Sequence, residues 1–121
     1  MNVIIAEAKG EVLNYIIALI EKNPGDALIV KQGRPMIRRD WLTHNDFFRC
    51  EFVTNWTQGG AILEREVTTL IERDGVWSAE VIGPDRFCYC CKGSTPLEAV
   101  MRAYGVSRLG YEVSVPAELV G

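Results

Sequence analysis

The segment that begins at Asn55 combines amide side chains, an aromatic ring and two adjacent glycines. Asn55 and Gln58 offer hydrogen-bonding amides, and Trp56 offers a flat stacking surface. Gly59 and Gly60 would let the backbone approach a ligand closely. We expect a loop here, whose backbone N–H groups and indole ring bind a planar or anionic ligand. The alternative is a Gly-Gly turn whose tryptophan packs in the core.

Three arginines and one threonine could contact a phosphate group. A guanidinium group donates paired hydrogen bonds to phosphate. Arg102 and Arg108 belong to one predicted helix, and Arg65 could lie close to them in the folded chain. Thr95 stands at the start of that helix, where free N–H groups also attract anions. The alternative is that the arginines are solvated or ion-paired surface residues, Arg108 being favoured by the helix dipole. Thr95 would then act only as a cap.

Cysteine chemistry is a further candidate. The chain has four cysteines, at Cys50, Cys88, Cys90 and Cys91, and no feature that indicates secretion, so reduced thiols are expected in place of disulfides. The last three could bind zinc together with Cys50 or His44, but their spacing is not the paired Cys-x2-Cys of zinc ribbons or fingers. We therefore predict buried or half-buried thiols and no metal site.

Catalysis has little support in the residues. His44 is the only histidine. The chain contains no Gly-x-Ser-x-Gly, His-Glu-x-x-His or phosphate-loop motif in which it could act. Glu64 and Glu66 are two residues apart and would share one face of a strand, which is most often a solvated edge. We therefore expect neither an enzyme nor a cofactor, and name no catalytic residue.

Composition limits the function classes further. The 121 residues suit a single domain, 1–121, with one core, and the net charge of −3 argues against a grip on duplex nucleic acid through the overall field. The net charge does not exclude a local basic groove. No apolar run is long enough to cross a bilayer, and the first residues lack the basic lead of a signal peptide. The sequence thus predicts a cytosolic protein without membrane contact.

Apolar spacing predicts an α+β fold, a small antiparallel sheet packed with two main helices. Residues 9–22 and 97–109 have helical spacing, and the second helix follows the capping box Thr95-Pro96-Leu97-Glu98. Strands are predicted at residues 2–5, 27–31, 67–72, 76–82, 86–92 and 111–115, with a hairpin turn at Asp74-Gly75. Residues 36–54 read mostly as loop, with only 50–53 extended. We find no repeat and no linker.

Two segments resemble the NinX-type family of accessory proteins carried by lambda-like bacteriophages. They are residues 54–66, Thr-Asn-Trp-Thr-Gln-Gly-Gly-Ala-Ile-Leu-Glu-Arg-Glu, and residues 93–119, from Gly-Ser-Thr-Pro-Leu-Glu-Ala-Val-Met-Arg-Ala-Tyr to Val-Pro-Ala-Glu-Leu. The chain departs from the family at Ala61, usually proline, and in the cysteine cluster at 88–91. The resemblance implies a small non-structural protein made in the infected bacterium, with no settled activity.

Three functions are compatible with these residues. The first is a counter-defence sponge that sequesters a nucleotide-type immune signal, a cyclic oligonucleotide or a cyclic ADP-ribose derivative, without cleaving it. The second is a module that docks onto a host or phage protein through exposed aromatic residues among Trp41, Phe47, Phe48, Trp56 and Trp77. The third is an enzyme that hydrolyses such a signal. A homo-oligomer is expected under either of the first two, because a small sheet often leaves an apolar face or edge for a second copy.

Overall fold

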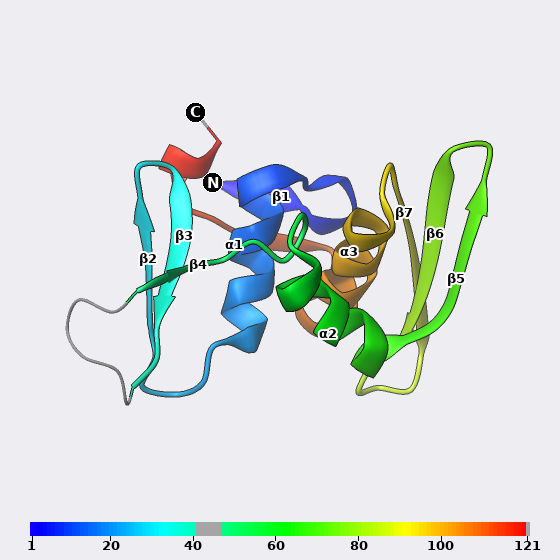
Figure 1. The fold of residues 1–121 in the computed structure, drawn as a ribbon, viewed down its shortest axis with the longest axis horizontal. Helices are drawn as coiled ribbons and strands as arrows, with labels where there is room; N and C mark the ends of the chain where they lie inside the picture. Colours follow the sequence, from blue (N-terminus) through cyan, green and yellow to red (C-terminus); the bar gives the residue numbers. More distant parts are fainter. Residues whose placement is uncertain (41–46, 121) are drawn as a thin grey trace.

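The fold is taken from a computed structural model that describes residues 1–40 and 47–120. Within them lie three α-helices, two short 3-10 helices and eight strands in three small antiparallel sheets (Figure 1). The α+β class and the antiparallel pairing are confirmed. The strands form separate sheets, and a third helix, α2 (Trp56–Glu66), joins the two that the sequence predicts.

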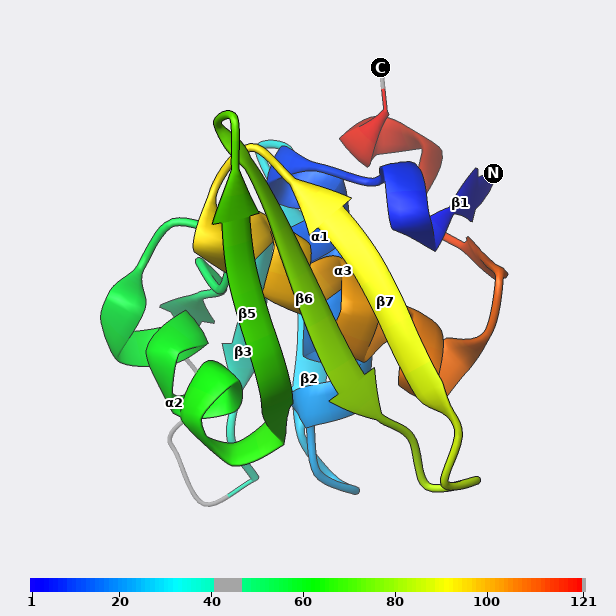
Figure 2. The same cartoon turned by 90° about the vertical axis from the view of Figure 1, so that its right-hand side faces the viewer.

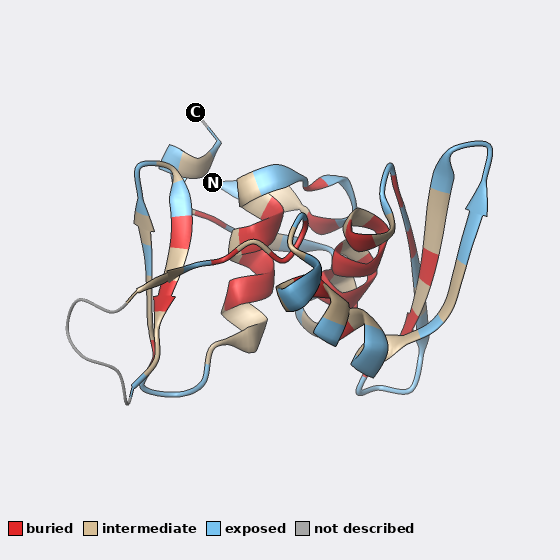
Figure 3. Cartoon of the chain, viewed as in Figure 1, coloured by how far each residue is buried: buried red, intermediate tan, exposed pale blue. Residues whose placement is uncertain are grey.

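Two helices form the centre of the molecule. α1 (Gly10–Glu21) and α3 (Pro96–Leu109) direct their apolar stripes into one buried core (Figure 3). They pack closely at Gly105, where a Cβ atom would lie 3.5 Å from Cγ2 of Ile16 in α1 and 2.8 Å from Cγ2 of Ile5. α3 begins at the predicted Thr95 cap and ends at Gly110, whose φ of 89° suits glycine. Both predicted helices are confirmed to within a residue or so at each end.

The largest sheet covers α3 on one side (Figure 2). It contains β5 (Val67–Arg73), β6 (Val76–Ile82) and β7 (Cys88–Gly93), paired in that order. The predicted hairpin is confirmed: Asp74 and Gly75 have φ of 54° and 80°, the left-handed values that a two-residue hairpin turn requires. Ala79 and Val81 point inward and are buried, so alternate residues of β6 point outward.

A second sheet packs against α1 through β3. Its strands are β2 (Ala27–Lys31), β3 (Arg34–Arg38) and β4 (Phe48–Arg49). β2 is confirmed, but the loop expected after residue 36 is partly strand, because the two-residue turn Gln32-Gly33 makes β3 the partner of β2. In β3 only Pro35 and Ile37 are buried, and the flanking arginines hid this short alternation. Residues 50–53, expected to be extended, instead lead into a turn before α2.

The two ends of the chain meet in the third sheet. β1 (Asn2–Ile4) pairs with β8 (Glu112–Ser114), and the Met1 amino group donates to the Val115 carbonyl at 3.0 Å. The 3-10 helices η1 (Ile5–Glu7) and η2 (Ala117–Leu119) follow these strands. The predicted terminal strands are thus confirmed in shorter form. Among the described residues, none of the helices is long and apolar enough to span a membrane.

Candidate functional site

The segment predicted as a ligand-binding loop is the first turn of α2. Asn55 is its N-cap, and the side-chain oxygen accepts a hydrogen bond from the Thr57 N–H at 2.8 Å. Gln58 reaches back in the same way, accepting from the Glu51 N–H and donating to the Arg49 carbonyl. The loop prediction was wrong because both amides serve the backbone of this turn, so the chain enters a helix where the glycines suggested a bend.

The two glycines of this turn have different neighbours. At Gly59 a Cβ atom would lie 2.1 Å from the Phe52 carbonyl oxygen and 3.0 Å from Cδ2 of Leu97. At Gly60 the nearest atom would be Cε3 of Trp56, at 3.4 Å, an ordinary contact. Neither glycine has a positive φ. Gly59 therefore permits the close approach of α2 to the preceding turn and to α3, and its role is in packing.

Trp56 lies on the surface beside a pocket. Its side chain is 57% exposed, so the alternative of a core tryptophan was wrong. A pocket of about 220 Å³ lies between the starts of α2 and α3. Its lining residues are Val53, Thr54, Trp56, Thr95, Pro96 and Leu97. Two of the predicted ligand-binding residues, Trp56 and Thr95, are thereby brought together from segments far apart in the sequence.

Thr95 has the capping role expected of it. Its Oγ1 accepts from the Glu98 N–H at 3.1 Å, and the Glu98 carboxylate accepts from the Ser94 N–H at 2.9 Å. This carboxylate offsets the positive end of the α3 dipole. α2 has no acidic residue in its own first turn; the Glu51 carboxylate before the helix accepts from the Asn55 side chain at 3.4 Å, but it is ion-paired with Arg49 at 3.3 Å. An anionic group is therefore better placed at the start of α2.

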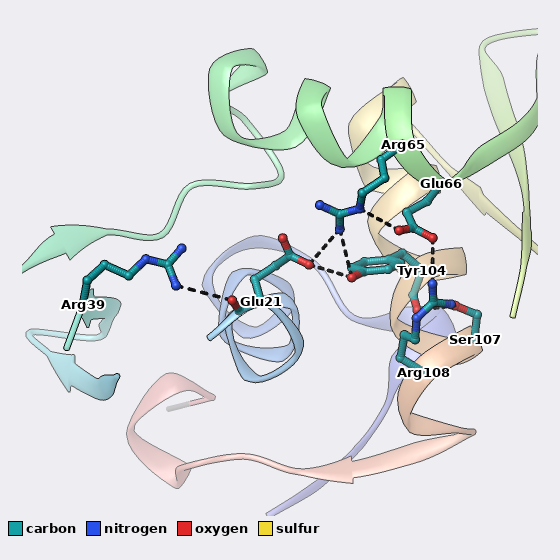
Figure 4. Close-up of polar contacts among 7 residues, drawn as sticks. All are labelled: Glu21, Arg39, Arg65, Glu66, Tyr104, Ser107 and Arg108. Atoms are coloured by element: carbon teal, nitrogen blue, oxygen red, sulfur yellow. Dashed lines mark hydrogen bonds and ion pairs between the residues drawn. The ribbon is translucent and has the colours of Figure 1, made fainter. Parts of the chain in front are cut away.

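Arg65 and Arg108 converge at the opposite ends of the same two helices, around Tyr104 (Figure 4). Arg65 pairs with Glu21 of α1 at 2.9 Å and with Glu66 at 2.7 Å. Arg108 also pairs with Glu66, at 2.7 Å. Both guanidinium carbons lie over the Tyr104 ring, 5.7 and 5.0 Å from its centroid. We call these five residues the helix-end cluster.

The helix-end cluster has balanced charges. Two arginines are matched by two glutamates, and the Tyr104 hydroxyl donates to Glu21 at 2.6 Å. Burial, and then the hydrogen bond to Glu21, raises the pKa of Tyr104 to about 12. The bond to Glu66 raises the pKa of Arg65 above its already high ordinary value. The cluster joins α1, α2 and α3, and each of its two arginines already donates to a carboxylate.

Arg102 lies apart from the helix-end cluster. Its Nε donates to the Ala8 carbonyl at 2.8 Å, its Nη1 donates to the Lys92 carbonyl at 2.8 Å, and it pairs with Glu98 at 3.4 Å. Arg102 thus holds η1 and β7 to α3. The structure brings two of the three predicted arginines together, and all three are ion-paired.

The cysteines do not gather at one point. Cys50 and Cys91 are buried, whereas Cys88 and Cys90 are exposed, contrary to the prediction for the latter two. Burial raises the pKa of Cys50 to about 12, so that thiol stays protonated. In residues 1–40 and 47–120 there is no group of three histidine, cysteine or acidic residues that could hold a metal ion. His44, named as a possible ligand, lies outside the described residues.

The predicted acidic pair is on a helix. Glu64 and Glu66 belong to α2, so the prediction of a shared strand face was wrong; Glu64 is exposed and Glu66 pairs with both clustered arginines. Tyr104 was not among the predicted site residues, because the helical spacing of residues 97–109 does not reveal its polar contacts. Glu21 was also missed, because the break at Asn23-Pro24 marks it only as a helix end.

The sequence analysis also did not identify Asp26 as a buried carboxylate. Asp26 is enclosed and accepts from the Asn23 N–H, the Asp40 N–H and the Arg39 guanidinium at 2.8, 2.9 and 2.6 Å. The bond from the Asn23 backbone, followed by those from Arg39 and Asp40, holds the pKa of Asp26 below its usual value despite burial. Its donors all come from the protein, so Asp26 stabilises the turn between α1 and β2.

Comparison with known proteins assigns a family. The family model described as Bacteriophage P22, NinX matches residues 4–108, which is most of the chain. The match includes the Trp56 pocket and the helix-end cluster, whereas residues 109–119 of the resembling segment lie beyond it. Among curated proteins, none matches the chain. The protein belongs to the bacteriophage P22 NinX family.

Proposed function

We propose that this protein is a counter-defence sponge: in the cytoplasm of the infected bacterium it binds a nucleotide-type immune signal at the Trp56 pocket and does not cleave it. The signal would be a cyclic oligonucleotide or a cyclic ADP-ribose derivative. The observation that carries the proposal is the exposed indole of Trp56 beside a pocket at the starts of two helices. A phage family supplies the biological setting.

The chemistry of the pocket suits a ring with an attached anion. An exposed indole stacks on the face of a nucleobase, as aromatic residues do in nucleotide sites. The first turn of α2, with no acidic residue to offset its dipole, suits a phosphate oxygen next to that ring. Apolar groups of Val53, Pro96 and Leu97 would surround the ring edge. Base stacking and phosphate contact would thus come from adjacent groups.

The size of the pocket limits what it encloses. At about 220 Å³ it is smaller than the roughly 300 Å³ at which pockets for drug-sized ligands begin. It therefore suits one ring system and its attached phosphate, and the rest of a larger signal would extend past Trp56 along the surface. Binding would depend on one base and one phosphate group, which predicts weaker binding than an enclosing site would give.

In this proposal Arg65, Arg102 and Arg108 stabilise the fold and do not contact the phosphate. Arg65, Arg108 and Arg102 are already ion-paired with Glu21, Glu66 and Glu98, respectively. To bind one of these arginines, a phosphate would have to displace a glutamate side chain that the fold already holds beside it. The pocket offers no nucleophile paired with a base among the described residues that line it, which supports binding without cleavage.

Thermal unfolding with a ligand panel tests the proposal. The panel contains cyclic dinucleotides, cyclic trinucleotides, cyclic ADP-ribose isomers, NAD and mononucleotides. A ligand at one hundred times its dissociation constant stabilises the native state by about 2.7 kcal/mol, a rise in Tm of roughly 10 °C. We expect this rise with one class, its loss in Trp56→Ala, and recovery of the intact ligand by chromatography.

Phe87→Ala is the matched control, because Phe87 is an aromatic residue as exposed as Trp56 but outside the pocket. It should keep the full rise in Tm. If no class of ligand raises Tm, or if Trp56→Ala binds as well as the parent chain, the proposal is wrong. A degraded ligand would show an enzyme in place of a sponge.

A docking module is the second candidate. Of the five aromatic residues first considered, Trp56 is strongly exposed, Phe47, Phe48 and Trp77 are half-buried, and Trp41 lies outside the described residues. Exposed aromatic residues are enriched at protein interfaces, and this observation favours Trp56 as the contact for a host or phage protein. Such a partner would be captured from infected cells by the parent chain and not by Trp56→Ala, with no small molecule raising Tm.

A further inference from the structure

The outer face of the β5–β6–β7 sheet is uncovered and carries exposed aliphatic side chains. α3 packs on the inner face, and Figure 2 shows the outer face toward the viewer with α3 behind it. Three aliphatic side chains on this outer face, Ile71, Val76 and Ile82, are 50%, 44% and 42% exposed. A groove of about 430 Å³ lies along it. Grouped aliphatic exposure of this kind marks an interaction surface.

The strand register arranges the outward side chains in four rows across the sheet. From the β5–β6 turn to the far end, the rows are Arg73 with Val76, Ile71 with Ser78 and Lys92, Thr69 with Glu80 and Cys90, and Ile82 with Cys88. The first row thus combines the cation Arg73 with the apolar Val76, the second row has the cation Lys92, the third has the anion Glu80, and the last has the apolar Ile82. No ion pair is recorded between Lys92 and Glu80 within the chain's described residues. If a second copy faces this one with the order of its rows reversed, the third row with Glu80 lies over the second row with Lys92.

We propose that this face is a homodimer interface, in which two copies pack outer face to outer face with the order of rows reversed. The two-fold axis lies between the sheets, crosses the strands and passes between the second and third rows. Val76 then packs on the partner's Ile82, and Ser78 faces the partner's Glu80. Lys92 lies one strand away from that same carboxylate. Each copy contributes one Lys92 and one Glu80, so the two-fold axis gives this contact twice.

Charge decides between the two ways of stacking the faces. If the two-fold axis ran along β6, each row would face itself, and Glu80 would lie directly opposite the partner's Glu80. Like charges facing each other across an interface are unfavourable. With the rows reversed, Glu80 faces a serine hydroxyl with Lys92 nearby, and Val76 faces Ile82. The reversed arrangement is therefore the favoured one.

The size of the face predicts a weak dimer. Three strands spaced about 4.8 Å apart and about 20 Å long present a face of roughly 300 Å², so two stacked copies cover roughly 600 Å² in total. That is below the roughly 1,200 Å² at which specific stable interfaces begin, so dissociation in the high micromolar range is expected. A monomer–dimer equilibrium should consequently be visible at ordinary laboratory concentrations.

Sedimentation equilibrium over a range of concentrations tests the dimer, and two cysteines give a second readout. Cys88 and Cys90 lie on the proposed interface and are exposed in the single chain, whereas Cys50 and Cys91 are buried. We expect the mass to rise from monomer to dimer and the rate of Cys88 and Cys90 alkylation by iodoacetamide to fall as the concentration rises. A chain that stays monomeric up to millimolar concentration would overturn the proposal.

Substitutions separate this face from the rest of the surface. Ile82→Glu should raise the dissociation constant at least about ten-fold and make alkylation independent of concentration. Ile29→Glu is the matched control, since Ile29 is an exposed isoleucine on β2 of another sheet, and it should leave the dimer unchanged. A dimer that survives Ile82→Glu and is lost in Ile29→Glu would overturn the proposal.

Charge reversal tests the reversed row order itself. Lys92→Glu would place a carboxylate beside the partner's Glu80 and should weaken the dimer about ten-fold. Glu80→Lys should weaken it in the same way. The double variant restores the opposite charges and should return the dissociation constant to within about three-fold of the parent value. If the double variant is as weak as the single ones, the reversed arrangement is wrong. Circular dichroism of each variant checks that the fold is retained.

Discussion

The two ends of α2 show opposite uses of polar and aromatic residues. At its C-terminal end, Arg65 and Glu66 bond to Glu21, Tyr104 and Arg108, so charged groups satisfy one another within the protein. At its N-terminal end, Trp56 points to solvent beside a pocket, and the first turn has no acidic residue. The C-terminal end joins three helices, and the N-terminal end has the features of a place where another molecule binds.

The direction of the helices accounts for this division. α2 and α3 begin together at the Trp56 pocket and end together at the helix-end cluster, so they run roughly parallel. Parallel helices bring like ends of their dipoles together. Arg65 and Arg108, each in the last turn of its helix, offset the two negative ends. The positive end of α2 lacks an equivalent residue in its first turn, which leaves it available to an anion.

The largest effect should come from the residue that sets α2 against its neighbours. Gly59→Ala would place a Cβ atom 2.1 Å from the Phe52 carbonyl oxygen, a backbone atom that cannot move without shifting the turn. We expect the free energy of unfolding to fall by about 3 kcal/mol, measured by urea denaturation.

Gly60→Ala is the control for that change. Its Cβ atom would meet Trp56 at 3.4 Å, and alanine is favoured over glycine inside a helix by up to about 1 kcal/mol. The adjacent substitution should therefore leave stability unchanged or raise it slightly. Equal destabilisation by the two substitutions would contradict the packing role given to Gly59.

The helix-end cluster should be the next most sensitive region. Glu66→Ala leaves Arg65 and Arg108 without their shared carboxylate in a partly buried site, and we expect a loss of about 2 kcal/mol. Glu64→Ala, an exposed change in the same turn, should stay within about 0.5 kcal/mol of the parent chain. If the two variants are equally stable by urea denaturation, the cluster does not hold the helices together.

Sequence patterns predicted those parts of the fold whose local signals agree with the final packing. The Thr95 capping box, the apolar stripes of α1 and α3 and the Asp74-Gly75 hairpin each carry a local cause, and each is confirmed. β3 was missed because Arg34 and Arg38 flank its short buried alternation. α2 was missed because Gly59 and Gly60 read as a turn, although tertiary packing against Phe52 and Leu97 requires glycine at position 59.

The candidate site was only partly predictable. Trp56 and Thr95 were named from their residue types, and they do lie on one pocket. Their proximity depends on the parallel packing of α2 and α3, which no spacing in the chain encodes. The arginines were named for phosphate because the guanidinium group suits it, but their carboxylate partners lie up to 44 residues away in the sequence. Pairing at that distance is a property of the fold.

High pH offers a way to weaken the helix-end cluster without substitution. Burial and the hydrogen bond to Glu21 raise the pKa of Tyr104 from an ordinary value near 10 to about 12. A raised pKa means that the folded state holds the proton more tightly, so this stability is present below pH 10 and is lost as the pH rises through 12. The loss should reach about 2 kcal/mol.

Tyr104→Phe isolates this contribution. The variant lacks the titrating hydroxyl, so its stability should fall less between pH 10 and 12 than that of the parent chain, as measured by urea denaturation at each pH. Cys50, whose pKa burial also raises to about 12, contributes to both proteins and begins to act nearer pH 9. Parallel curves for the two proteins above pH 10 would show that Tyr104 does not stabilise the cluster in its protonated form.

Trp56→Ala should have the smallest effect on stability and so completes the contrast between the two ends of α2. An exposed side chain contributes little buried area, and its removal should change the free energy of unfolding by less than about 0.5 kcal/mol. Glu66→Ala should show the reverse pattern, a lower stability with ligand binding retained when measured well below its Tm. If Trp56→Ala instead costs as much stability as Glu66→Ala, the indole is part of the scaffold, and the N-terminal end of α2 would no longer be distinguished from its C-terminal end.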